Sequence, residues 1–410
     1  MINSSFDIVI VGGGTAGVSA AIAASKDGLS VVLIEKQISL GGLAVHAEVG
    51  TICGIYKNSA DNEFNYNVGS FAASFSRELQ LLSNSEPLRE NSGLKFLPYN
   101  PKKLSEQCEI LLEKHGVTVF LGTELVQVAT ENNLVHAIRC EKENLAFVIN
   151  CKAIVDATGI SLVSKQLNLE VIDTILNQSA SQIFTLSKID FETEANLSLV
   201  LLTAVKKAVL EGKLKESQNR LYLVPGSLKG DEVALKITVP KEVGEDREEL
   251  RSIALDAVHD IVNFLVSNIG GFANAKLKSI APHVGVRIDD RPVGQSILNG
   301  EDVLNCVKPS DSIAYGNWPM EIWSQNRRVE LRRLKENDFY GISAKCLISN
   351  EIDNLFFAGR SISATDEAIA SARVIGTCLQ TGYASGRLAA GVLNAKKSQE
   401  TVDEIQKEQF

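Results

Sequence analysis

Three glycines and one acid near the start of the chain have the types and spacing that hold a dinucleotide. Gly12, Gly14 and Gly17 occupy the glycine positions of G-x-G-x-x-G. In such a motif the first glycine allows a tight turn, the second lets a pyrophosphate approach the backbone, and the third lets a helix pack closely on a strand. Glu35 follows at roughly the 20-residue spacing at which an acid meets a ribose hydroxyl. An acid there favours the unphosphorylated ribose of FAD or NAD over that of NADP.

The segments around these residues are the ones that must position them. Residues 7–11 form a short, β-branched apolar run, typical of a strand buried on both faces. Residues 18–26 are small helix formers followed by Gly28, and residues 29–34 form a second apolar strand that stops at Glu35. The free N–H groups at the start of such a helix receive phosphates. A glycine-rich turn in another α/β domain would explain the glycines alone, but not the strand, the helix and the acid together.

Length and composition indicate a globular protein of two domains, or of one domain with a large insertion. The chain has 410 residues, of which 45% are hydrophobic, and a net charge of −9. The negative balance argues against a nucleic-acid partner, which needs a basic face. The seven cysteines include no C-x-x-C pair and no metal-ligand spacing, so we expect reduced thiols and no metal. No signal peptide and no run of about 20 apolar residues is found, which predicts a cytoplasmic protein with no membrane partner.

The rest of the chain predicts two regions of different texture. The first is expected to hold helices at 71–82 and 101–115, then a meander of strands at 117–121, 124–130, 134–141 and 146–149, and a buried strand at 153–157. The second is expected to hold strands at 181–186 and 232–239 and helices at 197–210 and 248–266. A long helix of small residues is expected at 366–393, and the polar segment after it is expected to fray.

Four blocks of sequence, in a fixed order, span most of the chain. They are the glycine motif with Glu35, the Gly41-Gly42-Leu43 segment, residues 156–159 (DATG), and residues 358–365 (AGRSISAT) running into 371–374 (SARV). Residues 285–303 (GVRIDDRPVGQSILNGEDV) add a Gly-Val-Arg-rich segment. With these motifs the chain resembles the FAD-dependent oxidoreductases built on the glutathione-reductase-type fold. The last block is the most specific, because many dinucleotide-binding proteins share the first.

The resemblance implies a fold and a domain order. The fold would be α/β: a Rossmann-type FAD-binding domain with a parallel sheet and a β-meander, interrupted by an inserted α+β substrate domain. The FAD-binding domain would comprise residues 1–165 and 285–396, and the inserted domain residues 166–284. Parts of 43–98 and 300–345 would lie near the substrate pocket, and 397–410 would be a polar tail.

The resemblance also implies which residues hold FAD. Gly12, Gly14, Thr15, Ala16 and Gly17 would bind the pyrophosphate, Glu35 and Lys36 the adenosine ribose, and a backbone group near Val126 the adenine. Gly41, Gly42 and Leu43 would let the backbone approach the phosphates or ribityl chain, and Ala157, Thr158 and Gly159 would lie against the dinucleotide. Gly359 and Arg360 would reach the ribityl and phosphate region, and Ser371, Arg373 and Val374 would face the N1 and O2 edge of the flavin. Reduced flavin gathers negative charge there, which amide donors, a helix dipole or Arg373 would stabilise.

Two histidines and a cysteine are candidates for chemistry beside the flavin. His46 lies with Glu48 and Cys53 on the segment expected to pass the flavin, and His283 lies just before the Gly-Val-Arg segment. His46 is a candidate general acid or base, and either His46 or Cys53 is a candidate attachment point for a covalent flavin. The alternatives are a polar residue in a tight loop for His46 and a small buried thiol for Cys53.

Arg287 and Tyr340 are the remaining catalytic candidates. Arg287 either helps to clamp an anionic substrate or forms surface ion pairs with the acids at 289–290, and Tyr340 either donates a proton or packs. Two positions depart from the family pattern. Trp323 stands where relatives often carry a histidine, and residues 340–343 read YGIS in place of Tyr-x-Ile-Pro. Both departures fall where the substrate pocket is expected.

Absent motifs narrow the expected chemistry. No second G-x-G-x-x-G follows a strand, so a built-in nicotinamide domain is not expected, and the lack of a close cysteine pair disfavours disulfide reduction. We therefore expect an FAD-dependent oxidoreductase that transfers a hydride between a small organic substrate and flavin N5, with an external electron donor or acceptor. The alternatives are a flavin-dependent protein that modifies nucleic acid, such as tRNA, and a non-catalytic FAD-binding partner subunit.

Overall fold

A five-stranded parallel sheet forms the centre of the larger domain. The computed structural model describes residues 3–90, 92–176, 178–241, 246–324 and 329–410. The strand order is β22 (Leu355–Phe357), β11 (Ala153–Asp156), β2 (Ile8–Val11), β3 (Val31–Glu35) and β7 (Thr118–Leu121). β2 and β3 are buried along their whole length, because both faces of this sheet are covered.

Alternate residues of these strands enter two different cores. Ile8 and Ile10 face a layer of helices, whereas Val9 and Val11 face the β-meander. The helices nearest the sheet are α1 (Thr15–Ser25), α4 (Pro101–Lys114) and α10 (Ile375–Leu393), with α5 (Leu162–Gln166) following β11. The meander consists of β8 (Glu124–Glu131), β9 (Leu134–Lys142) and β10 (Leu145–Asn150), with β1 (Asn3–Ser5) parallel to β10. This arrangement confirms the predicted α/β fold with a parallel sheet and a meander.

The predicted strand at 117–121 is part of the parallel sheet and not of the meander. It forms β7 and pairs with β3 in parallel register, Val119 opposite Leu33. The physical reason is the helix before it. Because α4 crosses the sheet and returns the chain to the same end, the next strand runs parallel to β3, as in any β-α-β unit.

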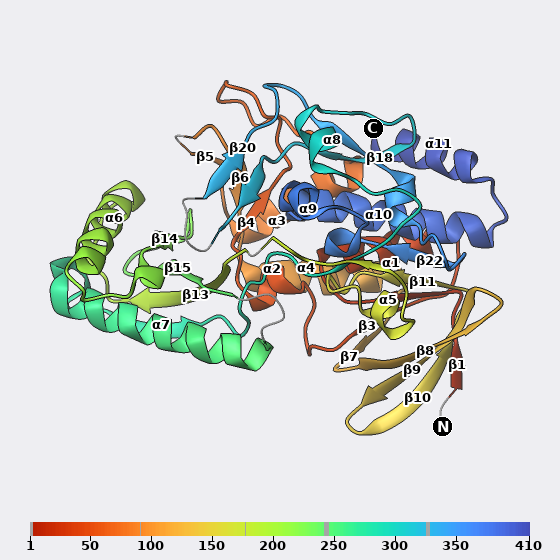
Figure 1. The fold of residues 1–410 in the computed structure, drawn as a ribbon, viewed down its shortest axis with the longest axis horizontal. Helices are drawn as coiled ribbons and strands as arrows, with labels where there is room; N and C mark the ends of the chain where they lie inside the picture. Colours follow the sequence, from red (N-terminus) through yellow and green to blue (C-terminus); the bar gives the residue numbers. More distant parts are fainter. Residues whose placement is uncertain (1–2, 91, 177, 242–245, 325–328) are drawn as a thin grey trace.

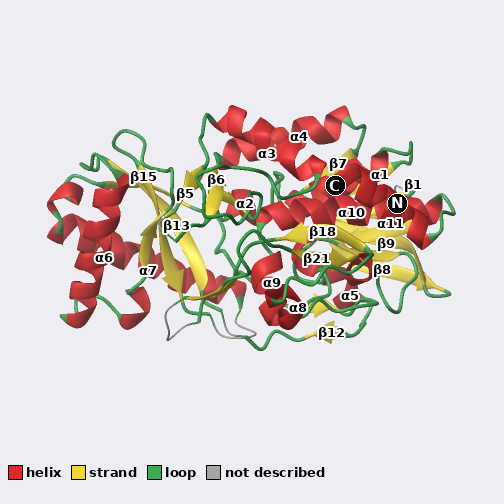
Figure 2. Cartoon of the chain, turned by 90° about the horizontal axis from the view of Figure 1, so that it is seen from above, coloured by secondary structure: helices red, strands yellow, loops and turns green. Residues whose placement is uncertain are grey.

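A separate antiparallel sheet with two helices forms the inserted domain (Figure 1). Its strand order is β14 (Leu221–Leu223), β15 (Val233–Val239), β13 (Ala180–Ser187) and β16 (Lys276–Ile280). The helices are α6 (Glu194–Leu210) and α7 (Arg247–Asn268), with the short turns η1 (Glu216–Gln218) and η2 (Gly270–Phe272). Figure 2 shows the sheet between these helices and the larger domain. Its buried residues form a core of their own, from Ala180 to Val286.

Short elements connect the two domains and cover the central helices. They are α2 (Leu43–His46), α3 (Ser70–Ser83), the sheet of β4 (Thr51–Cys53), β6 (Lys95–Pro98) and β5 (Leu88–Arg89), the pair β12 (Val171–Ile172) and β17 (Arg291–Pro292), and α8 (Gly300–Leu304). The later ones are the pairs β18 (Ser312–Gly316) with β21 (Tyr340–Ser343) and β19 (Met320–Ile322) with β20 (Glu330–Arg332), and η3 (Ala344–Leu347), η4 (Gly359–Ser361), α9 (Asp366–Ala372) and α11 (Ser398–Gln409). Within the described ranges, no helix combines the length and apolar character that a membrane span needs.

Two expectations for the C-terminal region were wrong. The helix expected at 366–393 is broken at Arg373 and Val374, which separate α9 from α10. The segment 397–410 does not fray, because α11 buries Val402 and Ile405. Gln409 at its end donates to the carbonyl of Ile313, 2.8 Å away. The low overall hydropathy of this segment hid a narrow apolar stripe.

Candidate active site

At Gly12 and Gly17 of the glycine motif, the structure leaves no room for a side chain. Gly12 has φ +103°, and a Cβ there would lie 2.8 Å from the carbonyl oxygen of Ala157. A Cβ at Gly17 would lie 1.8 Å from the carbonyl oxygen of Gly12, so the first turn of α1 rests directly on the loop. The carboxylate of Glu35 accepts a hydrogen bond of 2.6 Å from the N–H of Gly13. The predicted acid therefore lies against the loop that would hold the pyrophosphate.

A second glycine segment runs beside the first and leaves one position open. Gly41 donates a hydrogen bond of 2.8 Å to the carbonyl of Gly13, and Gly14 and Gly41 form a parallel bridge. A Cβ added to Gly14 would meet nothing closer than the Cα of Gly42, at 3.9 Å. Gly42 itself has φ +55° and precedes α2. The space above Gly14 therefore lets a ligand approach two backbone segments at once.

Helices α1 and α10 lie in direct backbone contact and run parallel. A Cβ at Gly382 would be 2.1 Å from the carbonyl oxygen of Ala16, and one at Gly386 would be 2.1 Å from that of Ala20. Equal steps along both helices mean that their N-termini point to the same end. At 1.5 Å per residue, α10 extends about 9 Å beyond the start of α1. Neither N-cap residue, Gly14 or Val374, makes a side-chain capping hydrogen bond, so both helices present free N–H groups to one region.

Arg360 adds a cation beside these helix ends. Its Nη1 donates to the carbonyl of Val286 at 3.1 Å, and a Cβ on Gly159 would lie 2.5 Å from its Nη2. Burial lowers the pKa of Arg360. Among the residues that the structure describes, no carboxylate lies within ion-pair distance of it. Gly159 is fixed by a 2.9 Å hydrogen bond to the hydroxyl of Ser361, which joins the DATG and AGR loops.

The other residues predicted to hold FAD lie around the same loops. Thr15 and Ala16 are buried in the first turn of α1, and Leu43 is the first residue of α2. The N–H of Thr158 donates a 2.9 Å hydrogen bond to the carboxylate of the buried Asp156. Lys36 is exposed beyond β3. Val126 lies at a register shift between Leu125 and Gln127, so it has no partner across the β8–β9 ladder.

The two candidate histidines come together from distant parts of the sequence. The rings of His46 and His283 stack with centroids 5.2 Å apart and an interplanar angle of 29°. The backbone N–H of His283 donates to the carbonyl of His46 at 2.8 Å. Burial, followed by the nearby His46, lowers the pKa of His283. The sequence indicated both residues but could not place them in contact.

Arg287 lies in a group of cations and aromatic rings that the sequence did not predict. Its guanidinium carbon lies 4.3 Å from the ring centroid of Trp323, and Nζ of Lys236 lies 5.0 Å from the same centroid. Arg373 pairs at 3.5 Å with Glu321, the middle residue of β19. The signal for Lys236 was a single cation in the middle of the apolar strand VALKITV. Its burial could not be known without the sheet register.

The acids near Arg287 pair with other cations. Asp289 and Asp290 pair with Lys165, at 3.6 and 2.8 Å, and Asp289 also pairs with Arg247 at 2.5 Å. Arg291 is fully buried in an ion pair with Asp366, within the wall of the domain. The alternative role expected for Arg287 was to form surface ion pairs with these acids. Lys165 and Arg247 form those ion pairs instead.

Tyr340 is fully buried and Cys53 is partly buried. Tyr340 has no exposed surface, and its hydroxyl lies 2.8 Å from that of Ser371, which donates to the carbonyl of Trp318 at 2.5 Å. This network anchors the end of α9 and leaves the phenol packed inside the domain. The thiol of Cys53 lies 3.8 Å from the Thr51 hydroxyl, and burial raises its pKa to about 12. A thiol with that pKa is protonated at neutral pH and is a weak nucleophile.

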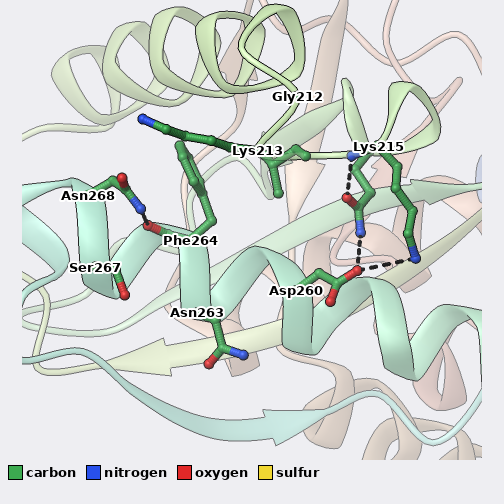
Figure 3. A pocket seen from close by; sticks show the side chains of 10 residues that line it. Gly212, Lys213, Lys215, Asp260, Asn263, Phe264, Ser267 and Asn268 are labelled. Carbon is green, nitrogen blue, oxygen red and sulfur yellow. Dashed lines mark hydrogen bonds and ion pairs between the residues drawn. The ribbon is translucent and has the colours of Figure 1, made fainter.

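A hollow of about 630 Å³ lies within the inserted domain, between η1 and α7 (Figure 3). Its polar groups bond to one another. The Gln218 amide donates to the Asp260 carboxylate at 2.9 Å, Lys215 lies 3.5 Å from the same oxygen, and the Asn268 amide donates to the Phe264 carbonyl. All ten lining residues belong to the inserted domain, so this hollow is remote in sequence from the glycine loops.

Comparison with known proteins identifies the family. The family model described as FAD dependent oxidoreductase matches residues 7–409. A search of curated proteins found no match. Three similar solved structures are a geranylgeranyl bacteriochlorophyll reductase-like protein from Thermoplasma acidophilum (14% identity, 99% of this chain and 83% of that chain, TM-score 0.52), p-nitrophenol 4-monooxygenase from Pseudomonas putida (13%, 99% and 84%, 0.50), and anhydrotetracycline hydroxylase from Streptomyces rimosus (11%, 98% and 65%, 0.52).

At these identities the solved structures show a shared fold, and the narrower glutathione-reductase-type assignment stays a prediction. The family match covers nearly the whole chain, including the glycine loops, the inserted domain and α10. The chain belongs to the FAD-dependent oxidoreductase family and is an enzyme whose cofactor is FAD.

Proposed function

We propose that this enzyme transfers a hydride between a small organic substrate and FAD. When bound, FAD supplies the redox chemistry, and the protein supplies binding, orientation and charge. The free N–H groups of α1, the open backbone at Gly14 and Gly42, and the unpaired Arg360 would hold the pyrophosphate. Glu35 would bind the ribose, and the backbone at Val126 the adenine. These groups fit a dinucleotide because they offer donors, a cation and open space at Gly14 for the phosphates, and a carboxylate for a ribose hydroxyl.

One observation carries the proposal. Two parallel helices without side-chain caps point their N-termini into one region, and α10 extends about 9 Å further than α1. This offset would leave α1 for the phosphates and α10 for a second negative charge further along the cofactor. Arg373 lies just before Val374, the N-cap of α10; its Nη2 pairs with Glu321, and its Nε is buried without a hydrogen-bond partner. A helix dipole and a guanidinium at that place favour the reduced, more negative state of a flavin.

We propose that the His46 and His283 pair handles the substrate proton. The lowered pKa of His283 keeps its ring neutral at pH 7, so a ring nitrogen is free to accept a proton. The carbonyl oxygen of Ser39, 3.3 Å from Nε2 of His46, would fix the orientation of that ring.

The absorption spectrum of the purified protein, before and after acid precipitation, tests the cofactor and its attachment. A flavin chromophore that enters the supernatant means non-covalent FAD, whereas colour in the pellet directs attention to His46 and Cys53. A colourless protein that cannot take up added FAD would contradict the proposal.

Anaerobic mixing with candidate donors then tests hydride transfer, because only a substrate bleaches the flavin band. Tight RNA binding at low salt would favour the nucleic-acid alternative.

The role of α10 and Arg373 is tested by the midpoint potential of the bound flavin. Arg373→Gln should lower it by about 20–40 mV, or about 1–2 kcal/mol for a two-electron couple. Arg373→Lys keeps the charge and should change it less. An unchanged potential in both variants would remove Arg373 from the flavin site. A flavin that is never reduced by any small donor would favour the partner-subunit alternative.

A further inference from the structure

The strand register of the inserted domain turns one lysine toward the larger domain. In β15, Val233, Leu235 and Ile237 pack on α6 and α7 in the core of the inserted domain. Successive side chains of a strand alternate between faces, so Lys236 points to the opposite face. Tyr222 is its cross-strand partner in β14 and shares that face. The face of the sheet away from its helices is thus the one that carries the lysine.

Two partly buried cations on that side share one acid, Glu321, whose charge acts on both from beyond ion-pair distance. Lys236 and Arg287 both lie over the ring of Trp323, and no carboxylate of the described residues is within ion-pair distance of either. Glu321, the nearest acid on β19, pairs with Arg373. Burial, and then the neighbouring Arg287, lowers the pKa of Lys236. Lys236 and Arg287 are both partly buried, and a cation that is partly removed from water without an anion beside it is costly, so this arrangement favours an anion from outside the chain.

This position is distinct from the pyrophosphate region. Glu321 and Lys236 act electrostatically on Cys53, which packs with Val374 at the start of α10. The glycine loops lie around the start of α1, about 9 Å further along the helix pair than the start of α10. The anion called for by Lys236 and Arg287 is therefore expected on the substrate side of the cofactor.

Buried donors and apolar rings lie next to the same cations. Trp323 is 6% exposed and Trp318 is 7% exposed, and the indole N–H of each is buried without a hydrogen-bond partner. Trp318 packs with Leu94, Phe96 and Val374 in a small apolar cluster. A ligand that satisfied these groups would carry acceptor oxygens at one end and an apolar body at the other.

We propose that the substrate is a small organic carboxylic acid whose carboxylate binds between Lys236 and Arg287, with its apolar part toward Trp318. The inference rests on the proposed function, since it names the substrate class of the same site. It makes Lys236 a binding residue that sets specificity for an anion. A carboxylate fits because it can accept hydrogen bonds from an ammonium and a guanidinium at once.

The test uses the flavin-loaded enzyme and four simple acids: acetate, benzoate, succinate and phthalate. Each is titrated at constant ionic strength against chloride, with the visible flavin spectrum and the melting temperature as readouts. At least one acid should perturb the spectrum and raise the melting temperature, whereas its neutral amide should do neither. Lys236→Met should weaken that acid's binding about tenfold or more, as expected for a charge-assisted hydrogen bond, and Lys236→Arg should restore part of it.

Lys276→Met is the matched control, because Lys276 is an exposed lysine on β16 of the same sheet. It should bind the acid as the wild type does. The inference is overturned if none of the four acids has an effect beyond chloride, if the amide binds as well as the acid, or if Lys236→Met binds the acid normally. A protein without a flavin spectrum would instead contradict the proposed function. A normal, reducible flavin that ignores all four acids would contradict only the carboxylate site.

Discussion

The buried and partly buried arginines of this enzyme divide by what they pair with. Arg291 forms a buried ion pair with Asp366, and the buried Arg387 lies 2.8 Å from Asp27 at the surface, so each has a carboxylate partner within the protein. Arg287 and Arg360 have only carbonyl and aromatic partners among the described residues. The first kind neutralises its own charge. The second kind leaves a positive charge for a ligand. A guanidinium without a carboxylate partner therefore indicates a binding site better than the exposed fraction of the side chain does.

Arg360→Gln is therefore expected to weaken FAD binding while the fold persists. Loss of a charge-assisted hydrogen bond costs about 1.5–3 kcal/mol, which corresponds to about a 10- to 150-fold increase in Kd. The measurement is titration of FAD into the flavin-free protein. Arg139→Gln is the control, because Arg139 is exposed on the meander. Equal affinity in the Arg360 variant and the wild type would place the phosphates elsewhere.

His283 should make stability depend on pH in a defined direction. Burial lowers its pKa in the folded state below the ordinary value of about 6.5, so the unfolded chain binds more protons in acid. The free energy of unfolding should then fall as the pH drops through and below about 6.5. His283→Asn cannot be protonated there and should lose less stability between pH 7.5 and 5.5 in urea unfolding. His136→Asn, at an exposed position, should behave as the wild type. An NMR titration of His283 at or above 6.5 would refute this.

At the scale of elements, the α1–α10 contact sets the geometry of the site. Glycines at two successive turns of α10 let the helices approach until backbone meets backbone, and Ser19 donates to the carbonyl of Leu379 at 2.6 Å across the same contact. This contact fixes both the direction and the offset of the two N-termini. The position of the second helix end is therefore determined by packing on the first.

Gly382→Ala should separate the helices and loosen the cofactor site. The added Cβ would lie 2.1 Å from the carbonyl oxygen of Ala16, so the helices must shift. Overpacking of this kind costs about 1–3 kcal/mol, and weaker FAD binding should accompany the lower unfolding free energy. Gly270→Ala is the control, because a Cβ at Gly270 would meet nothing within 4 Å. A variant with unchanged unfolding and FAD affinity would show that this contact does not set the site.

What the sequence could predict was local. The strand, glycine turn, helix and acid of residues 7–35 follow from neighbouring residues, and the structure has all of them. The contact of His46 with His283 and the inward position of Lys236 depend on how two domains meet, which no local pattern records. The break at Arg373 was missed because small apolar residues continue on both sides of it. The helix at 398–409 was missed because its few apolar residues gain their stability only from packing on the rest of the domain.

α11 should contribute measurably to stability although its sequence is polar. Ile405 has no exposed surface, and truncating such a side chain costs about 2–5 kcal/mol. Ile405→Ala should therefore lower the midpoint of urea unfolding. Val392→Ala, near the end of α10, is the control, because Val392 is 51% exposed. If both variants unfolded at the wild-type midpoint, the packing of α11 would not contribute to the stability of the fold.

At the scale of the whole molecule, the site is assembled from segments that are far apart in the chain. The segments expected to hold FAD come from both ends of the sequence: the glycine loop, the segment at Gly41, the DATG loop, the AGR loop and the start of α10. The inserted domain adds Lys236 from the middle of the sequence. The inserted domain has its own hydrophobic core, separate from the cores on the two sides of the parallel sheet. The two domains can thus respond differently to the same ligand.

Removal of FAD should reveal this division by hydrogen exchange. A ligand that binds only the folded state slows exchange by local opening where it binds, so its loss should speed exchange in the segments that hold it. Faster exchange is expected at 12–17, 41–46, 157–160, 359–361 and 373–377. Helices α6 and α7 should keep their exchange rates, because they pack in a core that does not include the cofactor site.

A carboxylic acid added to the flavin-loaded enzyme should then slow exchange in β15 and around 318–323, on the inner side of the inserted sheet. Uniform changes over both domains would mean that they unfold as one unit, and protection confined to the hollow at η1 would move the substrate site there.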